Sequence, residues 1–506
     1  MRTLAKKEEN GRENISCEVS EMFPGKSYVL FTYRIIKDVR LVYVPPIGIG
    51  NYGGETDNWV WPRHTGDFSF LRAYVAPDGS TANYSPDNVP FKPKHFIKVA
   101  PKGVSEGDFV FVLGYPGRTY RHKPSDYIAL YERTILPHLS RHYDYMIETM
   151  ENASRHDRAL QLRFADEIKG LANATKNYKG KIQGLRRLKL VDKRKAEEAE
   201  LQRFIAGNAE LKAKFGNTLE QLHGVYDEYA RFAIQEIVVT MIGRNQYLGT
   251  LASVMKAVDG GTLDAEKKEK LRGAIRNMWK EIHRPTETHF LATLLMQLAA
   301  LPAEQQPRGV AAFVGTVGAD REAVVERIRK AFDESVLGKE ENMLAMIEWD
   351  KARLASSNDP FIGIMREIAR LNEDVIKRRR NRDGELKRLE AEFIDAKMAW
   401  QQKQFIPDAN STLRLTYGYI KGYAPADATY YSPQTTLRGL IEKHTGEDPF
   451  IAPQALIDLY NTKNYDRTLE DALLKDVPVA MLYNMDTTGG NSGSPVLNAR
   501  GELVGV

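Results

Sequence analysis

The sequence predicts an α+β protein in which two β-rich stretches flank a long helical block. Residues 27–118 contain short runs of β-branched and aromatic residues, interrupted by Pro and Gly. From about residue 123 to 405 proline becomes scarce, charged residues increase, and apolar residues recur every three or four positions. From Leu413 the strand pattern returns and continues to the last residues. These three observations predict one β-rich body with a helical block inserted into it.

The first β-rich stretch is expected to hold four strands. Tyr28–Tyr33 and Val39–Val44 are β-branched and aromatic, and Pro45-Pro46 ends the second of these runs. Phe68–Val75 is the third expected strand. Val110–Gly117 is the fourth, an apolar run that ends in a turn at its Pro-Gly pair.

The helical block contains amphipathic segments of the kind that pack into bundles. Residues 182–204 and Ile364–Trp400 carry apolar residues at helical spacing, and Gly260-Gly261 and Pro302–Gly309 separate helices. The most apolar run, Phe290–Leu301, is much shorter than the roughly 20 residues that cross a bilayer. We therefore expect a buried helix there and no membrane span.

Two polar patterns in the helical block are expected to be solvated helix faces. Lys377–Arg382 is strongly basic, and a solvated face is preferred to a phosphate-binding patch. His138 and His142 are four residues apart, a spacing that could present both rings to a metal ion. No third ligand and no Cys lies near them in the sequence, so no metal and no cofactor is expected.

The second β-rich stretch ends in a loop and a hairpin. Strands are expected at Leu413–Ile420 and Val477–Tyr483. After a loop rich in Gly and Ser, Val496-Leu497 and Leu503–Val506 are expected to pair around a turn at Asn498–Gly501.

The loop at Thr487–Pro495 has the features of a site for a nucleophilic serine. Serine is a weak nucleophile, so it must be exposed beside backbone N–H donors. Gly490 and Gly493 let the chain turn without a Cβ clash. The N–H groups of Gly490 and Ser492 are then expected to form an oxyanion hole. The simpler alternative is a plain Gly/Ser turn between two strands.

Asp67 is the best candidate for a carboxylate partner of Ser492. Chymotrypsin-type proteases carry His, Asp and Ser in this order along the chain, and Asp67 precedes the expected strand at Phe68–Val75. Asp67 and Ser492 are 425 residues apart. A plain core of this type separates them by roughly ninety residues. The helical block accounts for most of the excess. An ordinary Asp in a turn before a strand is the alternative for this residue.

The general base of such a triad is expected to be absent from this chain. His64 is the only histidine before Asp67, and three residues cannot span the two strands that normally carry the pair. The other nine histidines follow Asp67 and would break the chain order.

Three motifs resemble the bacterial dipeptidyl-peptidase 7 and 11 family of serine exopeptidases. They are Gly54–Leu71, with its Thr-Asp-Asn-Trp-x-Trp-Pro-Arg-His-Thr-Gly-Asp-Phe run, together with Gly489–Leu497 and Asp38–Pro46. The resemblance covers essentially the whole chain and implies a chymotrypsin-like double β-barrel, incomplete here, with a helical cap domain inserted in the second barrel. In that family the catalytic His lies upstream of the point at which this chain begins, and the members continue past Val506. The chain is therefore expected to be an internal piece of a longer enzyme.

The resemblance implies a specific division of the chain. Residues 1–96 are expected to be the remainder of the first barrel. Residues 97–121 and 412–506 are expected to form the second barrel, and residues 122–411 the helical cap domain.

The resemblance also implies an activity, the removal of dipeptides from the free N-terminus of oligopeptides through an acyl-enzyme. As it stands the chain is expected to be inactive because the His is missing. Asn58 and Trp59 match residues that contact the substrate amino end in the family, and Asn173 matches a third, with Asn177 as a competitor. The alternatives are an endopeptidase on the same core and a non-catalytic helical scaffold.

Asp486 invites a different interpretation of the specificity. It stands six residues before Ser492, where trypsin carries the Asp that selects Lys and Arg. The resemblance argues against a basic preference, since related enzymes select acidic or bulky apolar side chains through a residue downstream of the serine.

Composition places few further limits on function. The net charge is +5, from 72 basic and 67 acidic residues spread along the chain, and by itself it argues neither for nor against nucleic acid. Since it resembles peptidases, the protein is expected to have no nucleic-acid partner. The single cysteine, Cys17, allows no internal disulfide. Residues 1–10 lack the apolar core of a signal peptide. The resemblance nevertheless implies a periplasmic or cell-surface enzyme with oligopeptides as substrates. The sequence leaves the oligomeric state open, with a homodimer as one candidate.

Overall fold

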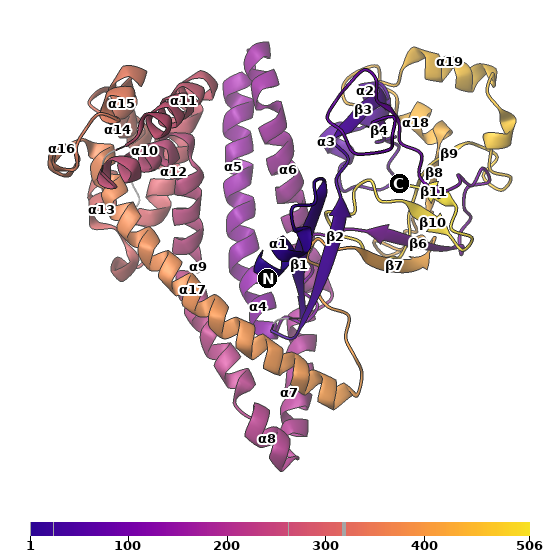
Figure 1. The fold of residues 1–506 in the computed structure, drawn as a ribbon, viewed down its shortest axis with the longest axis horizontal. Coiled ribbons are helices and arrows are strands. Elements are labelled where there is room, and N and C mark those ends of the chain that lie inside the picture. Colours follow the sequence, from indigo (N-terminus) through magenta and orange to yellow (C-terminus); the bar gives the residue numbers. More distant parts are fainter. Residues whose placement is uncertain (1, 24, 262, 316–319) are drawn as a thin grey trace. The chain divides into compact units, whose positions relative to one another are not determined.

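The computed structural model describes residues 2–23, 25–261, 263–315 and 320–506. They form two compact units, of which the first comprises residues 1–123 and 401–506 and the second residues 124–400 (Figure 1). The first unit contains the strands and the second is helical. The predicted mixture of helix and sheet is confirmed.

All the ladders of the first unit are antiparallel. A three-stranded sheet has the order β3 (Asp38–Tyr43), β4 (Phe70–Val75) and β5 (Val89–Pro90). A four-stranded sheet has the order β11 (Leu503–Gly505), β10 (Val496–Asn498), β6 (Phe109–Gly114) and β7 (Arg414–Tyr419). Two further pairs are β1 (Ile15–Phe23) with β2 (Ser27–Arg34), and β8 (Gln434–Thr436) with β9 (Pro478–Met481). The described residues form open sheets and no closed barrel. The double barrel and the division at residues 96, 121 and 411 stay predictions.

The four-stranded sheet has one buried face. Val110 and Val112 of β6 are buried together with Val496 of β10, and Val496 pairs with Val112 across the ladder. Side chains alternate between the two faces of a strand, so Phe109 and Leu113 of β6 lie on the exposed face. The buried face positions the chain that leads into β10.

Short helices cover part of the first unit: α1 (Arg2–Glu9), α2 (Ile47–Gly50), α3 (Gly54–Asp57), α18 (Leu437–Lys443), α19 (Gln454–Thr462) and the 3₁₀ turn η4 (Arg467–Leu469). A small apolar cluster joins Tyr52, which follows α2, to Leu437 and Leu440 of α18 and to Ala452. The Tyr52 hydroxyl donates a hydrogen bond to the Leu440 carbonyl at 2.8 Å. This cluster fixes the α2–α3 region against α18.

The second unit is an assembly of helices. In chain order they are α4 (Ser125–Leu130), the π-helix η1 (Tyr131–Ile135), α5 (Leu136–Ser154), α6 (Arg158–Arg187), α7 (Leu190–Ala206), α8 (Ala209–Phe215), α9 (Thr218–Arg244), α10 (Gln246–Asp259), α11 (Ala265–Glu281), α12 (Arg284–Ala299), η2 (Ala303–Gln305), α13 (Arg308–Val314), α14 (Arg321–Asp333), η3 (Val336–Gly338), α15 (Glu340–Met346), α16 (Lys351–Ser356) and α17 (Pro360–Gln401). Helix α12 is buried along most of its length, as the sequence predicted. None of the described helices combines the length and apolar character of a membrane span.

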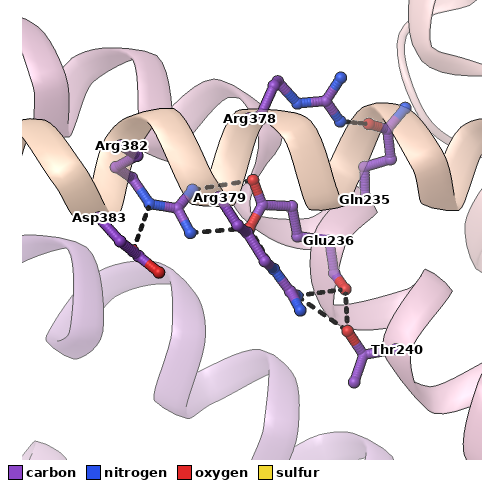
Figure 2. Close-up of polar contacts among 7 residues, drawn as sticks. All are labelled: Gln235, Glu236, Thr240, Arg378, Arg379, Arg382 and Asp383. Carbon is purple, nitrogen blue, oxygen red and sulfur yellow. Dashed lines mark hydrogen bonds and ion pairs between the residues drawn. The ribbon is translucent and has the colours of Figure 1, made fainter. Parts of the chain in front are cut away.

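Two long helices of this unit each contribute to two separate apolar cores. Helix α9 supplies Val225 to one core and Val238 to the other, and α17 supplies Leu389 and Val375 to the same two cores. Between these core positions α9 carries Gln235 and Glu236, which contact Arg378, Arg379 and Arg382 of α17 (Figure 2). The cores are therefore joined by a polar segment.

Glu236 of α9 is the centre of this polar segment. The predicted solvated face at Lys377–Arg382 is correct for Lys377, Arg380 and Asn381, which are exposed, and wrong for Arg378, Arg379 and Arg382, which are half-buried. The Glu236 side chain is 2% exposed and accepts two hydrogen bonds from Arg382, at 2.8 and 3.1 Å (Figure 2). Arg379 donates from Nε to the same carboxylate at 2.9 Å. Arg382 also lies over the Tyr229 ring, at 3.8 Å from the centroid. Buried carboxylates need such partners, and the arginines supply them.

The predicted solvated face at His138 and His142 is also wrong. His142 is buried in α5, and burial lowers its pKa to about 4, so the ring is neutral. Gln297 of α12 lies 3.5 Å from His142 Nδ1. Among the described residues, no group of three or more His, Cys, Asp or Glu side chains is arranged to hold a metal ion.

Candidate active site

Ser492 lies in a tight loop immediately before β10. Gly490 and Gly493 have φ values of 105° and 77°, which residues with a Cβ rarely adopt. The Asn491 N–H donates to the Thr488 carbonyl at 3.2 Å, and the Ser494 N–H donates to the Asn491 carbonyl at 2.9 Å. Two successive turns therefore bring Ser492 to an exposed position between the glycines.

The loop leaves backbone donors unused beside the serine. Within the ranges that the structure describes, the N–H groups of Gly490 and Ser492 donate to no protein acceptor. Free backbone N–H groups next to an exposed hydroxyl are what an oxyanion requires. Two backbone donors without protein acceptors therefore lie beside the exposed Ser492 hydroxyl within the described ranges.

The segment after β6 supports the loop from behind. The Gly117 N–H donates to the Gly489 carbonyl at 2.7 Å. A Cβ on Gly490 would lie 2.4 Å from the Tyr115 carbonyl oxygen, and a Cβ on Gly114 would lie 2.2 Å from Asn491 Oδ1. The two segments are thus closely packed. At Gly490 glycine is favoured for steric and conformational reasons, and at Gly114 a Cβ would require the Asn491 side chain to move.

Asn491 closes the loop on itself. Its side-chain amide donates to the Thr488 carbonyl at 3.1 Å, in addition to the bond from its backbone. The loop conformation therefore depends on contacts within the loop and with residues 114–117.

Asp67 lies in an extended segment between α3 and β4. The sequence placed it at the start of a strand from Phe68, whereas β4 begins at Phe70. The neighbouring Gly66 N–H donates to the Ile49 carbonyl at 2.8 Å, which holds this segment against α2. The Asp67 side chain is exposed. Both Asp67 and Ser492 belong to the first unit, and no described hydrogen bond joins their side chains.

Three histidines of the first unit have structural contacts. His64 is buried against α18, where a Cβ on Gly439 would lie 2.3 Å from its Nε2, and burial lowers its pKa. His122 Nε2 lies 2.8 Å from the Ile406 carbonyl oxygen. His444 Nδ1 accepts from the Ala452 N–H at 3.0 Å. These contacts place none of the three rings on Ser492 or Asp67.

Asn58 and Trp59 lie next to each other at the end of α3. Asn58 caps the helix and its side-chain amide donates to Glu55 at 3.1 Å. Trp59 has a φ of 62° and its side chain is 59% exposed.

Asn173 belongs to the second unit, on α6. Its side chain is exposed, and Asn177 one turn later is half-buried. The helix is tied to α5 near this point by Thr175, whose hydroxyl donates to Asp144 at 3.0 Å. The structure thus presents Asn173 on a fixed helix.

Asp486 is part of an ion pair. Its carboxylate lies 2.7 Å from Arg121 Nη1, and both side chains belong to the first unit. The negative charge already has a cationic partner. This contact disfavours the trypsin-like interpretation of Asp486, in which the carboxylate binds a substrate Lys or Arg.

Two contributors to this region escaped the sequence analysis. Residues 115–117 appeared only as the end of a strand, although they support the serine loop. Lys443 was not noticed, although its Nζ lies 2.9 Å from buried Asp57 beside Asn58. For residues 115–117, the Pro116-Gly117 pair after an apolar strand was the available signal in the sequence. For Lys443 the local sequence carries no signal.

Comparison with known proteins places this site in a family. The profile described as Peptidase S46 matches residues 1–506. An Asp/Glu-specific dipeptidyl-peptidase of Capnocytophaga gingivalis is 33% identical over 500 residues, which cover 96% of this chain and 69% of the relative. A dipeptidyl-peptidase 7 of the same species is 32% identical over 519 residues, 98% of this chain and 70% of the relative.

Solved structures give the same result. The crystal structure of Porphyromonas endodontalis DPP11 in complex with the dipeptide Arg-Asp matches with a TM-score of 0.80 and 29% identity. The match covers 99% of this chain and 72% of the DPP11 chain.

Proposed function

This chain belongs to the peptidase S46 family, and from this premise we propose that it is a serine-type dipeptidyl-peptidase that removes dipeptides from the free N-terminus of oligopeptides. The observation that carries the proposal is the loop at residues 489–494. It exposes Ser492 between two glycines and leaves the Gly490 and Ser492 N–H groups free of protein acceptors within the described ranges. Its relatives carry the names of dipeptidyl-peptidases.

Acyl transfer at this site uses each residue in a defined role. The Ser492 hydroxyl attacks the carbonyl carbon of the peptide bond, and the Gly490 and Ser492 N–H groups stabilise the resulting oxyanion. A histidine base accepts the serine proton and returns it to the leaving amine, and Asp67 orients that imidazole. We assign none of the described histidines to this role, so the 506-residue chain alone is expected to be inactive.

Recognition of the substrate amino end would distinguish an exopeptidase from an endopeptidase. An ammonium group needs oxygen acceptors and partial shielding from water. The exposed Trp59 ring and the Asn58 and Asn173 amides are the residues proposed to contact it. The double-barrel core and the inserted helical cap domain are part of the same proposal.

The test is an assay of the protein expressed from its complete gene. Dipeptide substrates with a chromogenic leaving group are offered with free and with N-acetylated amino ends. Cleavage of the free form alone is expected. Equal cleavage of both forms would favour an endopeptidase, and activity unchanged by Ser492→Ala would favour a non-catalytic scaffold whose hydrolysis comes from a contaminant.

The location and assembly of the protein form a separate part of the proposal. The family resemblance supports a periplasmic or cell-surface location, and a homodimer is proposed as the assembly. Cell fractionation with activity staining would test the location, and sedimentation of the purified protein would test the assembly. Activity confined to the cytosolic fraction would contradict the first, and a monomer at micromolar concentration would contradict the second.

A further inference from the structure

Residues 58–61, here called the Trp59 loop, have a conformation that needs external support. Asn58 and Trp59 follow α3, and Trp59 has a φ of 62°. Residues with a large side chain seldom occupy this region, and such conformations persist only where surrounding contacts enforce them. Trp59 is 59% exposed, and the residues on either side of it make the contacts described next.

Lys443 connects the two ends of the Trp59 loop. Its Nζ lies 2.9 Å from Asp57 Oδ2, directly before the loop, and 2.8 Å from the Pro62 carbonyl oxygen, directly after it. Asp57 is 5% exposed, so the pair is shielded from water on the carboxylate side. One ammonium group thus joins both ends of the loop to the last residue of α18.

Further contacts hold the chain around the loop on the same surface. The Thr435 hydroxyl donates to the Arg63 carbonyl at 2.7 Å, and the Trp61 indole N–H donates to the Ser432 carbonyl at 3.0 Å. His64 is packed against Gly439 of α18. Within the loop, Trp59 is 59% and Val60 47% exposed, and Asn58 is half-buried. The loop is therefore held at its base while part of it remains on the surface.

The ion pair also removes an electrostatic obstacle. A free cation close to Asn58 and Trp59 would repel the α-ammonium group of a substrate. The Lys443 charge is balanced by Asp57, and its protons are directed at Asp57 and Pro62. Conversely, the Asp57 carboxylate is already engaged and is not the acceptor for the substrate.

We propose that Lys443, paired with Asp57, is a positioning residue that holds Asn58 and Trp59 in the conformation that receives the substrate amino end. It touches no reacting atom and acts through the loop. The part of this inference that concerns substrate rests on the proposed function. The part that concerns the loop rests on the contacts of Lys443 alone.

The loop is tested by hydrogen exchange of the 506-residue chain, which requires no activity. Lys443→Met and Asp57→Asn are compared with Lys443→Arg, which keeps the charge, and with Arg438→Gln. Arg438 is the matched control because it lies on the same helix in an exposed pair with Glu442, at 3.9 Å. Faster exchange confined to peptides over residues 58–63 is expected in the first two variants. The Arg438 variant should match the wild type, and Lys443→Arg should lie between.

The substrate role is tested in the protein expressed from its complete gene. A misplaced binding group typically costs about ten- to a hundredfold, so KM for a free-amino dipeptide substrate should rise by that factor in Lys443→Met, with kcat changed less than about threefold. A variant that only loses stability would keep its KM and lose active enzyme. If Lys443→Met fails to fold, Asp57→Asn carries the same measurement.

The outcomes separate the two ideas. Unchanged exchange over residues 58–63 in both variants would overturn the positioning role. Altered exchange with an unchanged KM would overturn its link to the substrate. A wild-type enzyme that cleaves acetylated and free substrates equally would overturn the proposed exopeptidase, and the exchange data would still decide whether Lys443 holds the loop.

Discussion

Ser492 combines exposure with free backbone donors, and these two properties make its chemistry testable. We expect Ser492→Ala to abolish labelling by a fluorophosphonate and to lower kcat by at least about 10³-fold in the protein expressed from its complete gene. Thermal unfolding should remain within about 1 °C of the wild type, because the side chain is exposed. Ser494→Ala in the same loop is the control for the labelling. Labelling of the Ser492→Ala variant would show that another residue is the nucleophile.

Gly490 is expected to be sensitive to the smallest possible change. A Cβ at this position would lie 2.4 Å from the Tyr115 carbonyl and would occupy a φ of 105°. Gly490→Ala should move the N–H donor away from the oxyanion and lower kcat by about 10²–10³-fold. Gly489→Ala is the matched comparison, since a Cβ there meets open space. Equal activity of the two variants would contradict the assigned oxyanion role.

At the scale of single residues, the tight loop around Ser492 could be predicted from the sequence because its conformation depends on two nearby glycines. The positive φ values at Gly490 and Gly493 follow from residue type and spacing. Lys443 and Asp57 could not be paired in this way. They are 386 positions apart, and their contact depends on how α18 packs against Tyr52.

At the scale of elements, the α9–α17 segment around Glu236 makes a stability prediction. Removing one partner from a buried ion pair typically costs about 3–5 kcal/mol, since the remaining charges stay buried. Glu236→Gln should therefore lower the free energy of unfolding by about 3 kcal/mol, as Arg382 is only 13% exposed. Denaturant titration measures the change.

Glu269 provides the control for that measurement. It contacts Arg272 and Arg276 at 3.4 and 3.5 Å, and its own side chain is 65% exposed. Exposed pairs contribute about 0–1 kcal/mol, so Glu269→Gln should have little effect. Equal destabilisation by the two variants would mean that burial of Glu236 contributes nothing.

Helices and strands could be predicted from the sequence where one of their faces is continuously apolar, and were missed where polar residues interrupt that face. Strands β2, β3, β4, β6 and β7 and helix α17 follow their apolar patterns closely. Strand β1 was missed because Glu18 and Glu21 interrupt its pattern, and it exists by pairing with β2 along its length. The arginines of α17 were assigned to solvent because their partner Glu236 is 143 residues away from Arg379.

At the scale of the whole molecule, the stability of the chain should depend on pH through Glu287. Burial, and secondarily Glu167, raises the pKa of this carboxyl to about 7, while a hydrogen bond from the Asn245 amide at 2.6 Å opposes the rise. The folded state therefore holds a proton that the unfolded state releases above pH 4.5. Stability contributed by the protonated form is fully present below pH 4.5 and is lost as the pH rises to about 7.

Glu287→Gln should remove this dependence. A pKa rise from 4.5 to about 7 corresponds to about 3 kcal/mol, so the variant should be more stable than the wild type by up to that amount at pH 8 and equal to it at pH 4. Unfolding midpoints measured across this pH range decide the matter. Glu266→Gln, at an exposed position of α11, should show no pH-dependent difference.

The fold class of the whole chain could be predicted from the sequence because proline content, charge content and apolar spacing change sharply at the borders of the helical unit. The borders fall at residues 123 and 401 in the structure, close to the change of texture near residues 123 and 405. Closure of the strands into barrels depends on pairing between strands far apart in the sequence, which local residue patterns do not specify. The double barrel therefore stays a prediction.

The two continuous helices that link both apolar cores have a consequence for length variation. An α-helix turns by about 100° per residue. One residue inserted into α17 between Val375 and Leu389 would therefore rotate the later side chains away from the apolar core that they pack against. The same would hold for α9 between Val225 and Val238. Natural insertions and deletions in relatives should therefore spare these two spans and gather in the turns between helices. A relative that gains or loses a single residue there must restore the phase with a bulge in the helix.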